Sequence, residues 1–269
     1  MSVELSNEVS RELLLLAEQA ARKAGALLRG AYASDAGVQS TVGKDIKTEA
    51  DQAAEQYILD HLRASGYRIL SEESGLSSES IPGESLRRPQ QIMSASEPIW
   101  IIDPLDGTYN FTRGFPACCV SIALWAANQP LLGVVYDFTS EAMYSGIVGL
   151  GATCNGVSIF VSDTDELQHA ALATGFPSAR DFSHSSLVSF VQQVQEFKKI
   201  RMIGSAALSH AYVASGILDA YFEEDIWLWD VAAGLALVKA AGGGFSISNI
   251  KDSWQLTVMA SNLKIPFSL

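Results

Sequence analysis

Two aspartates follow an apolar run in the stretch EPIWIIDPLDGTYNFTRGFP. Residues 99–102 are apolar, Asp103 comes next, and Asp106 follows three positions later. The apolar run is typical of a buried strand, so both carboxylates are expected where that strand ends. A D-P-x-D-G turn is common by itself, but such a turn does not require Thr108 and Asn110 after it. The stretch therefore indicates a place where carboxylates meet a ligand.

Three further stretches put carboxylates at the edge of a predicted helix or strand. Asp51 lies in the first turn of a helix, Glu72 and Glu73 end a strand, and Asp230 begins the last long helix. In layered α/β proteins, ligands bind at the carboxyl ends of strands and the N-termini of helices. Carboxylates gathered at one place raise one another's pKa values unless a cation lies among them. The four stretches together favour a cation site.

The types of these residues favour Mg²⁺ as the cation. None of the four stretches contains histidine or cysteine, which argues against zinc. Mg²⁺ prefers oxygen ligands and binds one or two carboxylates, leaving other positions to water and phosphate. Gly107 and Thr108 add backbone N–H groups, which bind phosphate oxygens at turns and helix starts. The sequence therefore predicts metal-assisted phosphate chemistry, in which cations attract the anionic substrate.

Each stretch also has an ordinary structural interpretation. Thr48 and Asp51 fit a capping box, and Asp230 could be a simple N-cap. Glu72 and Glu73 could form a solvated turn. Taken singly, Asp51 and Asp230 favour these interpretations, and it is the combination of the four stretches that favours a site.

Composition limits the remaining function classes. The chain has 269 residues, of which 48% are hydrophobic and 18% charged, so it can bury one large core or two joined ones. A net charge of −12 argues against nucleic-acid or anionic-membrane partners. The start lacks the pattern of a signal peptide, and no apolar run reaches the length of a membrane span. Three cysteines without a C-x-x-C pair favour a reducing compartment, so we expect a cytoplasmic protein.

Apolar periodicity and turn residues predict the elements that carry these carboxylates. A polar connection from Ser74 to Pro98 is long for a compact domain. Successive strands with layered helices predict an α+β sandwich. The predicted helices cover residues 7–32, 48–66, 186–199, 205–216 and 229–244, and the predicted strands cover 67–70, 119–125, 131–137, 141–148, 200–204, 219–224 and 245–248.

Several motifs resemble those of the inositol monophosphatase family. DPLDGTYNF is similar to the family's D-P-[ILV]-D-G-T-x-N-F signature, and SEES is similar to its G-E-E-S segment. TEADQ and WDVAAGLALVKAAGG resemble its T-x-x-D and W-D-x-A-A-G…A-G-G motifs, and GSAA and DAYFE stand where that family has near-identical strings. The order is collinear from about Asp45 to Gly243.

The resemblance implies a five-layered α/β/α/β/α sandwich of the inositol monophosphatase and sugar phosphatase type. It implies a single domain over residues 1–269, with most metal ligands in the half before about residue 150 and substrate residues and Asp230 in the half after it. The activity it implies is a lithium-sensitive phosphomonoesterase with two or three Mg²⁺ ions. It also implies a homodimer.

The resemblance assigns roles residue by residue. Glu72, Asp103 and the carbonyl of Leu105 would hold a first metal, and Glu72 would also hold a weaker third ion through water. Asp103, Asp106 and Asp230 would hold the second metal. The resemblance also implies roles in catalysis and substrate binding. Glu72 and Thr108 would position the attacking water, and Asp51 would hydrogen-bond Thr108. The N–H groups of Gly107 and Thr108 would bind the phosphate, and the alcohol portion of the substrate would contact Ala206, Glu223, Asp106 and Asp230.

The chain departs from the family pattern at a few positions. Ser71 replaces a glycine, Lys47 stands where valine is usual, and Ala240 replaces a glutamate. None is an expected metal ligand. Lys47 precedes the turn that carries Asp51, so its charge could alter metal affinity or contact the substrate. The polar connection over 74–98 is longer than expected and could form a flap over the site or be a tolerated surface insertion.

The substrate stays open at this stage. Inositol monophosphate or a related small polyol or sugar phosphate is the first expectation. Other enzymes of the same superfamily act on 3′-phosphoadenosine 5′-phosphate, histidinol phosphate or fructose 1,6-bisphosphate, and the fold does not separate these. A regulatory protein-binding role on the same fold is the alternative from another class. The four histidines do not cluster by spacing, and we assign them no role.

Overall fold

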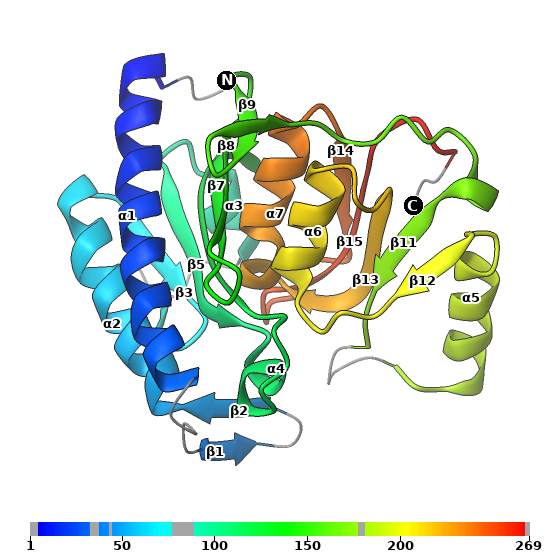
Figure 1. Cartoon of the computed structure of the whole chain (residues 1–269), viewed down its shortest axis with the longest axis horizontal. Coiled ribbons are helices and arrows are strands. Elements are labelled where there is room, and N and C mark those ends of the chain that lie inside the picture. The colour runs from blue at the N-terminus through cyan, green and yellow to red at the C-terminus, as the bar shows by residue number, and fades with distance from the viewer. Residues whose placement is uncertain (1–4, 33–37, 43–44, 77–88, 177–180, 267–269) are drawn as a thin grey trace.

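Two helices near the N-terminus form the first layer of this computed structural model (Figure 1). α1 (Asn7–Tyr32) and α2 (Glu49–Leu62) pack side by side on one face of the first sheet. α1 buries alanine and leucine side chains three or four residues apart, the period of an amphipathic helix. α2 continues into η1 (Arg63–Ser65), which Gly66 closes with a φ of 74°. Both predicted helices are confirmed.

The structure describes residues 5–32, 38–42, 45–76, 89–176 and 181–266.

The first sheet forms the second layer and has eight strands in the order β10-β9-β8-β7-β6-β5-β3-β4. β3 and β5 run parallel, and the other neighbouring pairs are antiparallel. Trp100 and Ile122 pack with α1 and α2, whereas Ile101 and Ala123 pack on the opposite face. The sheet is therefore buried on both faces. Its strands are β3 (Arg68–Ser71), β4 (Gly75–Leu76), β5 (Ile99–Asp106), β6 (Cys119–Ala126), β7 (Gln129–Asp137), β8 (Ala142–Ile147), β9 (Gly151–Cys154) and β10 (Val157–Ile159).

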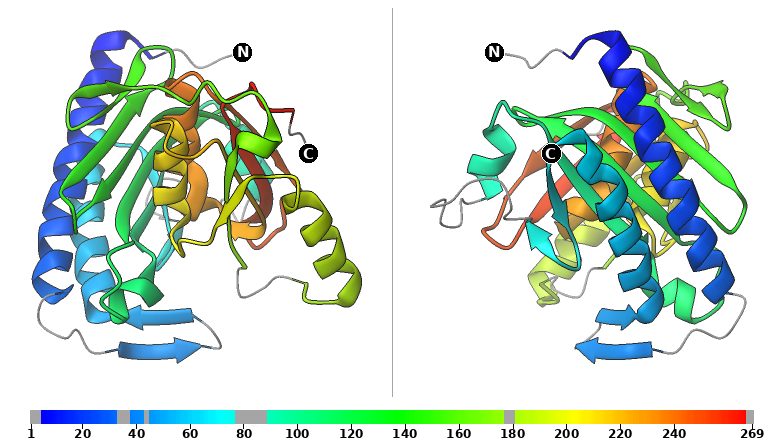
Figure 2. Two further views of the ribbon diagram at one scale, coloured as in Figure 1. Left: turned by 45° about the vertical axis from the view of Figure 1, so that its right-hand side comes forward. Right: turned by 90° about the vertical axis from the view of Figure 1, so that its left-hand side faces the viewer.

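The remaining three layers are α6 with α7, a second sheet, and α5 (Figures 1 and 2). α6 (Ala206–Ala214) and α7 (Leu228–Ala240) contact both sheets. On the outer face of the second sheet, Phe190 and Val194 of α5 (His184–Val194) pack against Leu172. These layers confirm the predicted α/β/α/β/α order. The second sheet has the order β12-β11-β13-β15-β14, with β11 (Ala171–Thr174), β12 (Lys199–Arg201), β13 (Ala220–Trp227), β14 (Gly244–Ser248) and β15 (Gln255–Ser261).

Some elements differ from those predicted. The connection from Ser74 to Pro98 contains β4 and α3 (Pro89–Ser94), and the part over 77–88 lies outside the described residues. The helix predicted over 186–199 ends at Val194, because the chain turns there and enters β12. The sequence reasoning also missed β9, β10, β11, β15, the hairpin of β1 (Val38–Val42) with β2 (Asp45–Thr48), α4 (Thr108–Thr112) and η2 (Leu167–His169).

Among the helices of the described ranges, none is both long and apolar enough to cross a membrane.

Candidate active site

Asp103 and Asp106 project from the same face of β5 because the strand carries a bulge. Asp103 pairs with Ser121 of β6 and Asp106 pairs with Cys119, with a shift of register between them. Ser121 and Cys119 are two residues apart and so share a face of β6. The extra residue on β5 brings both carboxylates to that face, whereas a regular strand would turn residues three apart to opposite sides.

Asp106 is bound by the start of α6. Its Oδ2 accepts hydrogen bonds from the Ser205 hydroxyl at 2.5 Å and the Ala207 N–H at 2.8 Å. The Ala206 N–H lies 3.4 Å from Oδ1. Ser205 is also the N-cap of α6 and accepts the Leu208 N–H. The helix N-terminus favours a negative charge and so helps to fix Asp106.

The turn after Asp106 requires glycine and uses both polar groups of Leu105. Gly107 has a φ of 86°, and a Cβ there would lie 2.6 Å from the Ala117 carbonyl oxygen. Asp103 Oδ1 accepts the Leu105 N–H at 2.9 Å, and the Thr108 hydroxyl donates to the Leu105 carbonyl at 2.9 Å. A carbonyl oxygen has two lone pairs, so the Leu105 carbonyl can still bind a metal. The predicted bond between Asp51 and Thr108 stays a prediction.

Asn110 links this turn to the segment before α6. Its amide nitrogen donates to the carbonyl oxygens of Ala117 at 2.8 Å and Ile203 at 2.9 Å. Asn110 belongs to the motif DPLDGTYNF, which predicts a ligand site. Its contacts fix the position of the turn relative to α6, whose first residues bind Asp106.

Glu72 stands directly after β3, beside the end of β5. Its N–H donates to the Ile102 carbonyl at 3.2 Å. Because β3 and β5 are parallel, their carboxyl ends lie at the same edge of the sheet. The carboxyl groups of Glu72 and Asp103 lie close enough to share a hydrogen bond, which lowers the pKa of Glu72 and raises that of Asp103. Two carboxylates can share such a bond only when one of them is protonated.

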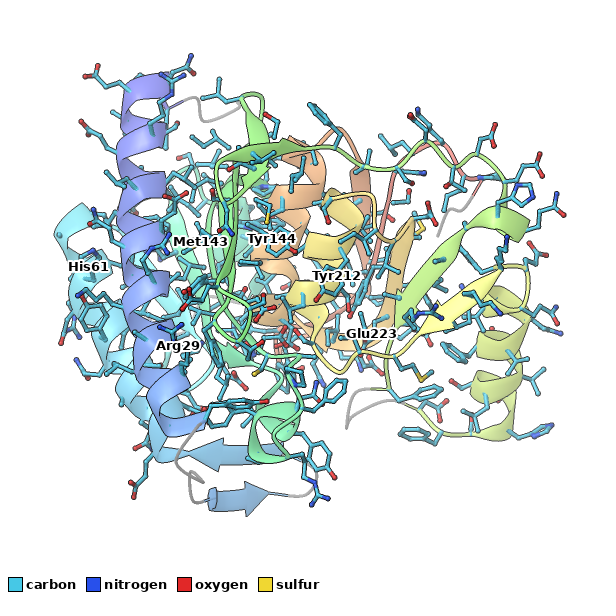
Figure 3. The ribbon with its side chains drawn as sticks, in the orientation of Figure 1. Arg29, His61, Met143, Tyr144, Tyr212 and Glu223 are labelled. Carbon is cyan, nitrogen blue, oxygen red and sulfur yellow. The ribbon has the colours of Figure 1, made fainter. Side chains whose placement is uncertain are left out.

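The other predicted residues come from three more elements. Asp51 is buried in the first turn of α2, and Asp230 is half-buried in the first turn of α7. Glu223 lies buried on β13 (Figure 3). Its Oε2 accepts the Tyr221 hydroxyl at 2.5 Å. A Cβ on Gly175 would lie 2.6 Å from the same oxygen, so glycine leaves room for this carboxylate.

Electrostatics show that these carboxylates lie within reach of one another. The pKa of Glu72 is raised to about 7, chiefly by burial; the hydrogen bond to Asp103 opposes this rise, and the charges of Glu73, Asp51 and Asp106 add to it. Burial, and then the charges of Glu72, Asp106 and Asp230, raises the pKa of Asp103 well above its ordinary value.

The pKa values of the two remaining carboxylates move the same way. Burial raises the pKa of Asp106 despite its bonds to the start of α6. Burial also raises the pKa of Asp230 well above its ordinary value, with Glu72, Asp106 and Glu223 adding to the shift. Without a bound cation, these four carboxylates therefore stay protonated to a higher pH than ordinary carboxylates do.

The chemistry of these donors fits Mg²⁺. Glu72, Asp103, Asp106 and Asp230 supply only hard oxygen ligands, and the cluster has excess negative charge to neutralise. Within the described residues, no three His, Cys, Asp or Glu side chains already form a group that could hold an ion. Mg²⁺ needs only one or two carboxylates and completes its shell with water, so the donor set is compatible with it.

Sequence reasoning missed two residues that orient site carboxylates. Ser205 lies in GSAA and could have been found as a serine that begins a helix. Tyr221 lies two residues from Glu223 on a strand, so the period of two puts both on one face.

The positions that depart from the family pattern have different surroundings. Ser71 is buried at the end of β3, next to Glu72. Ala240 ends α7, where a Cβ on Gly146 would come within 3.1 Å of the Ala240 Cβ, so this contact suits a small residue. Lys47 lies in β2, and its side chain falls outside the described part.

A cavity of about 520 Å³ has a lining that contains none of these carboxylates. Ser186, Glu224 and Lys251 are among its lining residues, and none of the lining residues is a predicted site residue. The Lys251 ammonium pairs with Asp225, and both residues line the cavity.

Comparisons with known proteins identify the family. The sequence model of the inositol monophosphatase family matches residues 10–266. Inositol monophosphatase 3 of Solanum lycopersicum is 36% identical over 237 residues, covering 86% of this chain and 84% of that protein. The Nus factor SuhB of Xylella fastidiosa is 40% identical over 202 residues, covering 74% of this chain and 68% of that protein.

A solved structure leads to the same family. The inositol monophosphatase from Anabaena (Nostoc) sp. PCC 7120 superposes with a TM-score of 0.76 at 34% identity, covering 94% of this chain and 91% of that chain. The family match spans nearly all of the chain, and the layers of the fold agree with it. The chain therefore belongs to the inositol monophosphatase family, whose members are phosphoric monoester hydrolases.

Proposed function

We propose that the chain is a Mg²⁺-dependent phosphomonoesterase that hydrolyses inositol monophosphate or a related small polyol or sugar phosphate. One observation carries the proposal: the carboxylates of Glu72, Asp103, Asp106 and Asp230 interact with one another beside the Gly107–Thr108 turn. The names of the relatives support inositol monophosphate as the first substrate to test.

In the proposed mechanism, Glu72, Asp103 and the Leu105 carbonyl hold one ion, and Asp103, Asp106 and Asp230 hold a second. A third, weaker ion would lie near Glu72. When bound, Mg²⁺ makes coordinated water a nucleophile near neutral pH and stabilises the leaving oxygen.

The chain's own groups then orient the reactants. Glu72 and the Thr108 hydroxyl direct the attacking water, with Asp51 supporting Thr108, and the N–H groups of Gly107 and Thr108 bind phosphate oxygens. The Ala206 main chain and the Glu223 carboxylate contact the alcohol portion, with Asp106 and Asp230 nearby. Positioning and charge stabilisation account for most of the catalysis, because phosphoryl transfer needs little covalent help from the protein.

A panel of four substrates tests the proposal. Inositol 1-phosphate, 3′-phosphoadenosine 5′-phosphate, histidinol phosphate and fructose 1,6-bisphosphate are each incubated with the protein and Mg²⁺, with and without lithium. We expect inositol 1-phosphate to have the highest kcat/KM, and lithium to inhibit its hydrolysis. A higher kcat/KM for another member of the panel would replace the substrate, and no release from any of them would remove the enzymatic proposal.

A regulatory role is the second candidate. It is favoured by relatives that carry the name Nus factor SuhB, one of them 40% identical to this chain. If the protein releases no phosphate from the panel with Mg²⁺, this role takes first place.

We also propose that the whole chain works as one unit, because the site takes residues from both sheets. A homodimer and a cytoplasmic location complete the proposal. Cys118, Cys119 and Cys154 carry free thiols, which suits a reducing compartment. Light scattering of the purified protein gives the subunit number directly, and a monomer would remove the proposed dimer.

A further inference from the structure

We propose that Glu55, a buried carboxylate of α2, is a positioning residue that holds the turn carrying Glu72. It acts through hydrogen bonds from Ser71 and Ser74, which flank Glu72 in the sequence. The inference rests on the proposed function for the role of Glu72 as a metal ligand. Glu55 takes no part in the mechanism described above.

The hydrogen bonds of Glu55 all come from this one turn. The side chain is buried, with 8% of its surface exposed. Its Oε1 accepts the Ser74 N–H at 3.0 Å, the Ser74 hydroxyl at 2.8 Å, and the Ser71 hydroxyl. A buried carboxylate is unfavourable without such donors, and here three donors converge on one oxygen. Across the described ranges, no basic side chain forms an ion pair with Glu55.

The turn needs such an anchor because the strands beside it are short. β4 has only two residues, Gly75 and Leu76, which pair with Ser71 and Leu70 of β3. Glu72, Glu73 and Ser74 form the turn between these strands. A two-residue strand contributes few ladder bonds, and fixing turn residues costs conformational entropy. Glu55 binds the turn at both ends and so fixes the backbone from which Glu72 projects.

This arrangement explains the serine at position 71. The family segment that SEES resembles has glycine there, and glycine has no hydroxyl to donate. Ser71 is fully buried, and its hydroxyl is directed to Glu55. α2 thus serves the site twice: Asp51 in its first turn, and Glu55 four residues later on the same side of the helix.

Mn²⁺ binding measured by titration calorimetry tests the inference without relying on activity. We expect Glu55→Ala to weaken Mn²⁺ binding by roughly tenfold or more, the usual cost of removing a partner behind a metal ligand. Glu55→Gln keeps an acceptor oxygen and removes the charge, so it should keep most of the affinity. If Glu55→Ala does not fold, as judged by circular dichroism, the double variant Ser71→Gly/Ser74→Ala takes its place and should weaken binding in the same direction.

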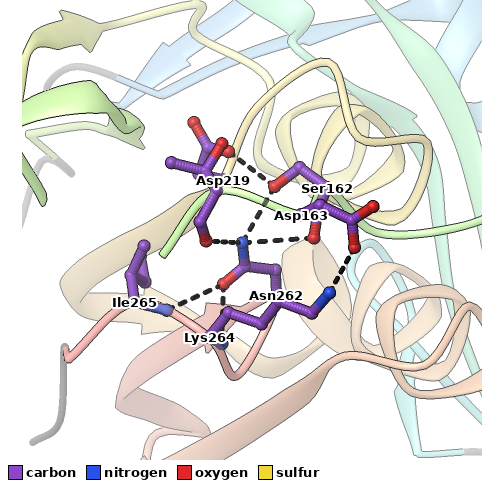
Figure 4. Close-up of polar contacts among 7 residues, drawn as sticks. Ser162, Asp163, Asp219, Asn262, Lys264 and Ile265 are labelled. Carbon is purple, nitrogen blue, oxygen red and sulfur yellow. Dashed lines mark hydrogen bonds and ion pairs between the residues drawn. The ribbon is translucent and has the colours of Figure 1, made fainter. Parts of the chain in front are cut away.

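Asp219→Ala is the matched control (Figure 4). Asp219 is also a buried carboxylate that accepts a serine hydroxyl, from Ser162 at 2.5 Å, and a backbone N–H, from Ala171 at 2.6 Å. Asp219 follows the C-terminal end of α6 in the sequence, whereas Asp106 is bound at the N-terminal end of this helix. We expect Asp219→Ala to lower the melting temperature and leave Mn²⁺ affinity unchanged.

Two results would overturn the inference. One is a Glu55→Ala protein that folds and binds Mn²⁺ as the unaltered protein does. The other is an equal loss in Glu55→Gln and Glu55→Ala, which would assign the effect to charge rather than to the hydrogen bonds. Phosphate release is measured separately. A protein that binds Mn²⁺ but hydrolyses nothing would contradict the proposed function, while the affinities of the variants would still decide the role of Glu55.

Discussion

At the scale of single residues, hydrogen bonds fix the direction of individual site carboxylates. Asp106 is held by Ser205 and the N–H groups at the start of α6, and Glu223 is held by Tyr221. The Tyr221 hydroxyl engages Oε2 of Glu223, and in the proposed mechanism this carboxylate contacts the alcohol portion of the substrate. A carboxylate that binds the alcohol and not the phosphate should govern substrate preference.

Replacing Glu223 should therefore change selectivity more than chemistry. We expect Glu223→Gln to raise KM for inositol 1-phosphate by roughly tenfold or more, because a charged hydrogen bond is lost, and to change kcat little. Tyr221→Phe removes only the orienting hydroxyl and should shift KM in the same direction by less. Steady-state kinetics with 4-nitrophenyl phosphate, which has no polyol, is the control. An equal rise in KM for both substrates would show that Glu223 does not bind the alcohol portion.

At the scale of elements, the layers bring the strand ends and helix starts together by close packing. α1 packs so tightly on β7 that a Cβ on Gly25 would lie 2.6 Å from the Tyr136 ring. Near the end of the same helix, Gly30 is exposed and has no atom within 4 Å of such a Cβ. The two glycines of α1 therefore have different roles.

Alanine at these two positions should have opposite effects. We expect Gly25→Ala to reduce the free energy of unfolding by about 1–3 kcal/mol, because the added methyl overpacks the contact with β7. Gly30→Ala should increase it by about 0.5–1 kcal/mol, since alanine favours the helix. Urea denaturation of the two variants gives both values. A Gly25→Ala protein as stable as Gly30→Ala would contradict the packing described for α1.

The elements also show what a sequence can and cannot predict here. The helices over 7–32 and 49–65 were predictable because their apolar residues recur at helical spacing. β15 was missed because all seven of its residues are buried, so it shows no alternation. β4 and α3 are too short to produce a pattern.

The same limit applies to the candidate site. Motifs placed the carboxylates at strand ends and helix starts. The bulge that turns Asp103 and Asp106 to one face depends on pairing with β6. The bonds from Ser205 to Asp106 and from Ser71 to Glu55 join residues 99 and 16 positions apart. Such tertiary contacts leave no local signal in the sequence.

At the scale of the whole molecule, the site adds to the repulsion within a chain of net charge −12. The carboxylates come from both halves of the chain, so the fold must hold them together against that repulsion. In the metal-free protein, their raised pKa values mean that the folded state binds more protons than the unfolded state at moderately acidic pH.

The stability of the metal-free protein should therefore fall with rising pH. The unfolded pKa of Glu72 is near 4. Its folded pKa is raised to about 7. Glu72 therefore adds to the free energy of unfolding below about pH 4, and this stabilisation is lost as pH rises through about 7. We expect the melting temperature in EDTA to decrease from about pH 5 to pH 8, and Mg²⁺ to raise it most at pH 8. Glu72→Gln should flatten this slope. A melting temperature in EDTA that rises from about pH 5 to pH 8, with the same slope in Glu72→Gln, would contradict the raised pKa values.

Phosphate release by Asp103→Asn tests the central claim most directly, because Asp103 is assigned to both metals. The assay uses inositol 1-phosphate at saturating Mg²⁺. The control is Asp163→Asn, which removes the same charge at an exposed position of the chain. We predict that Asp163→Asn hydrolyses the substrate as the unaltered protein does, and that Asp103→Asn releases no phosphate above background. Near-normal turnover by a folded Asp103→Asn protein would contradict the account.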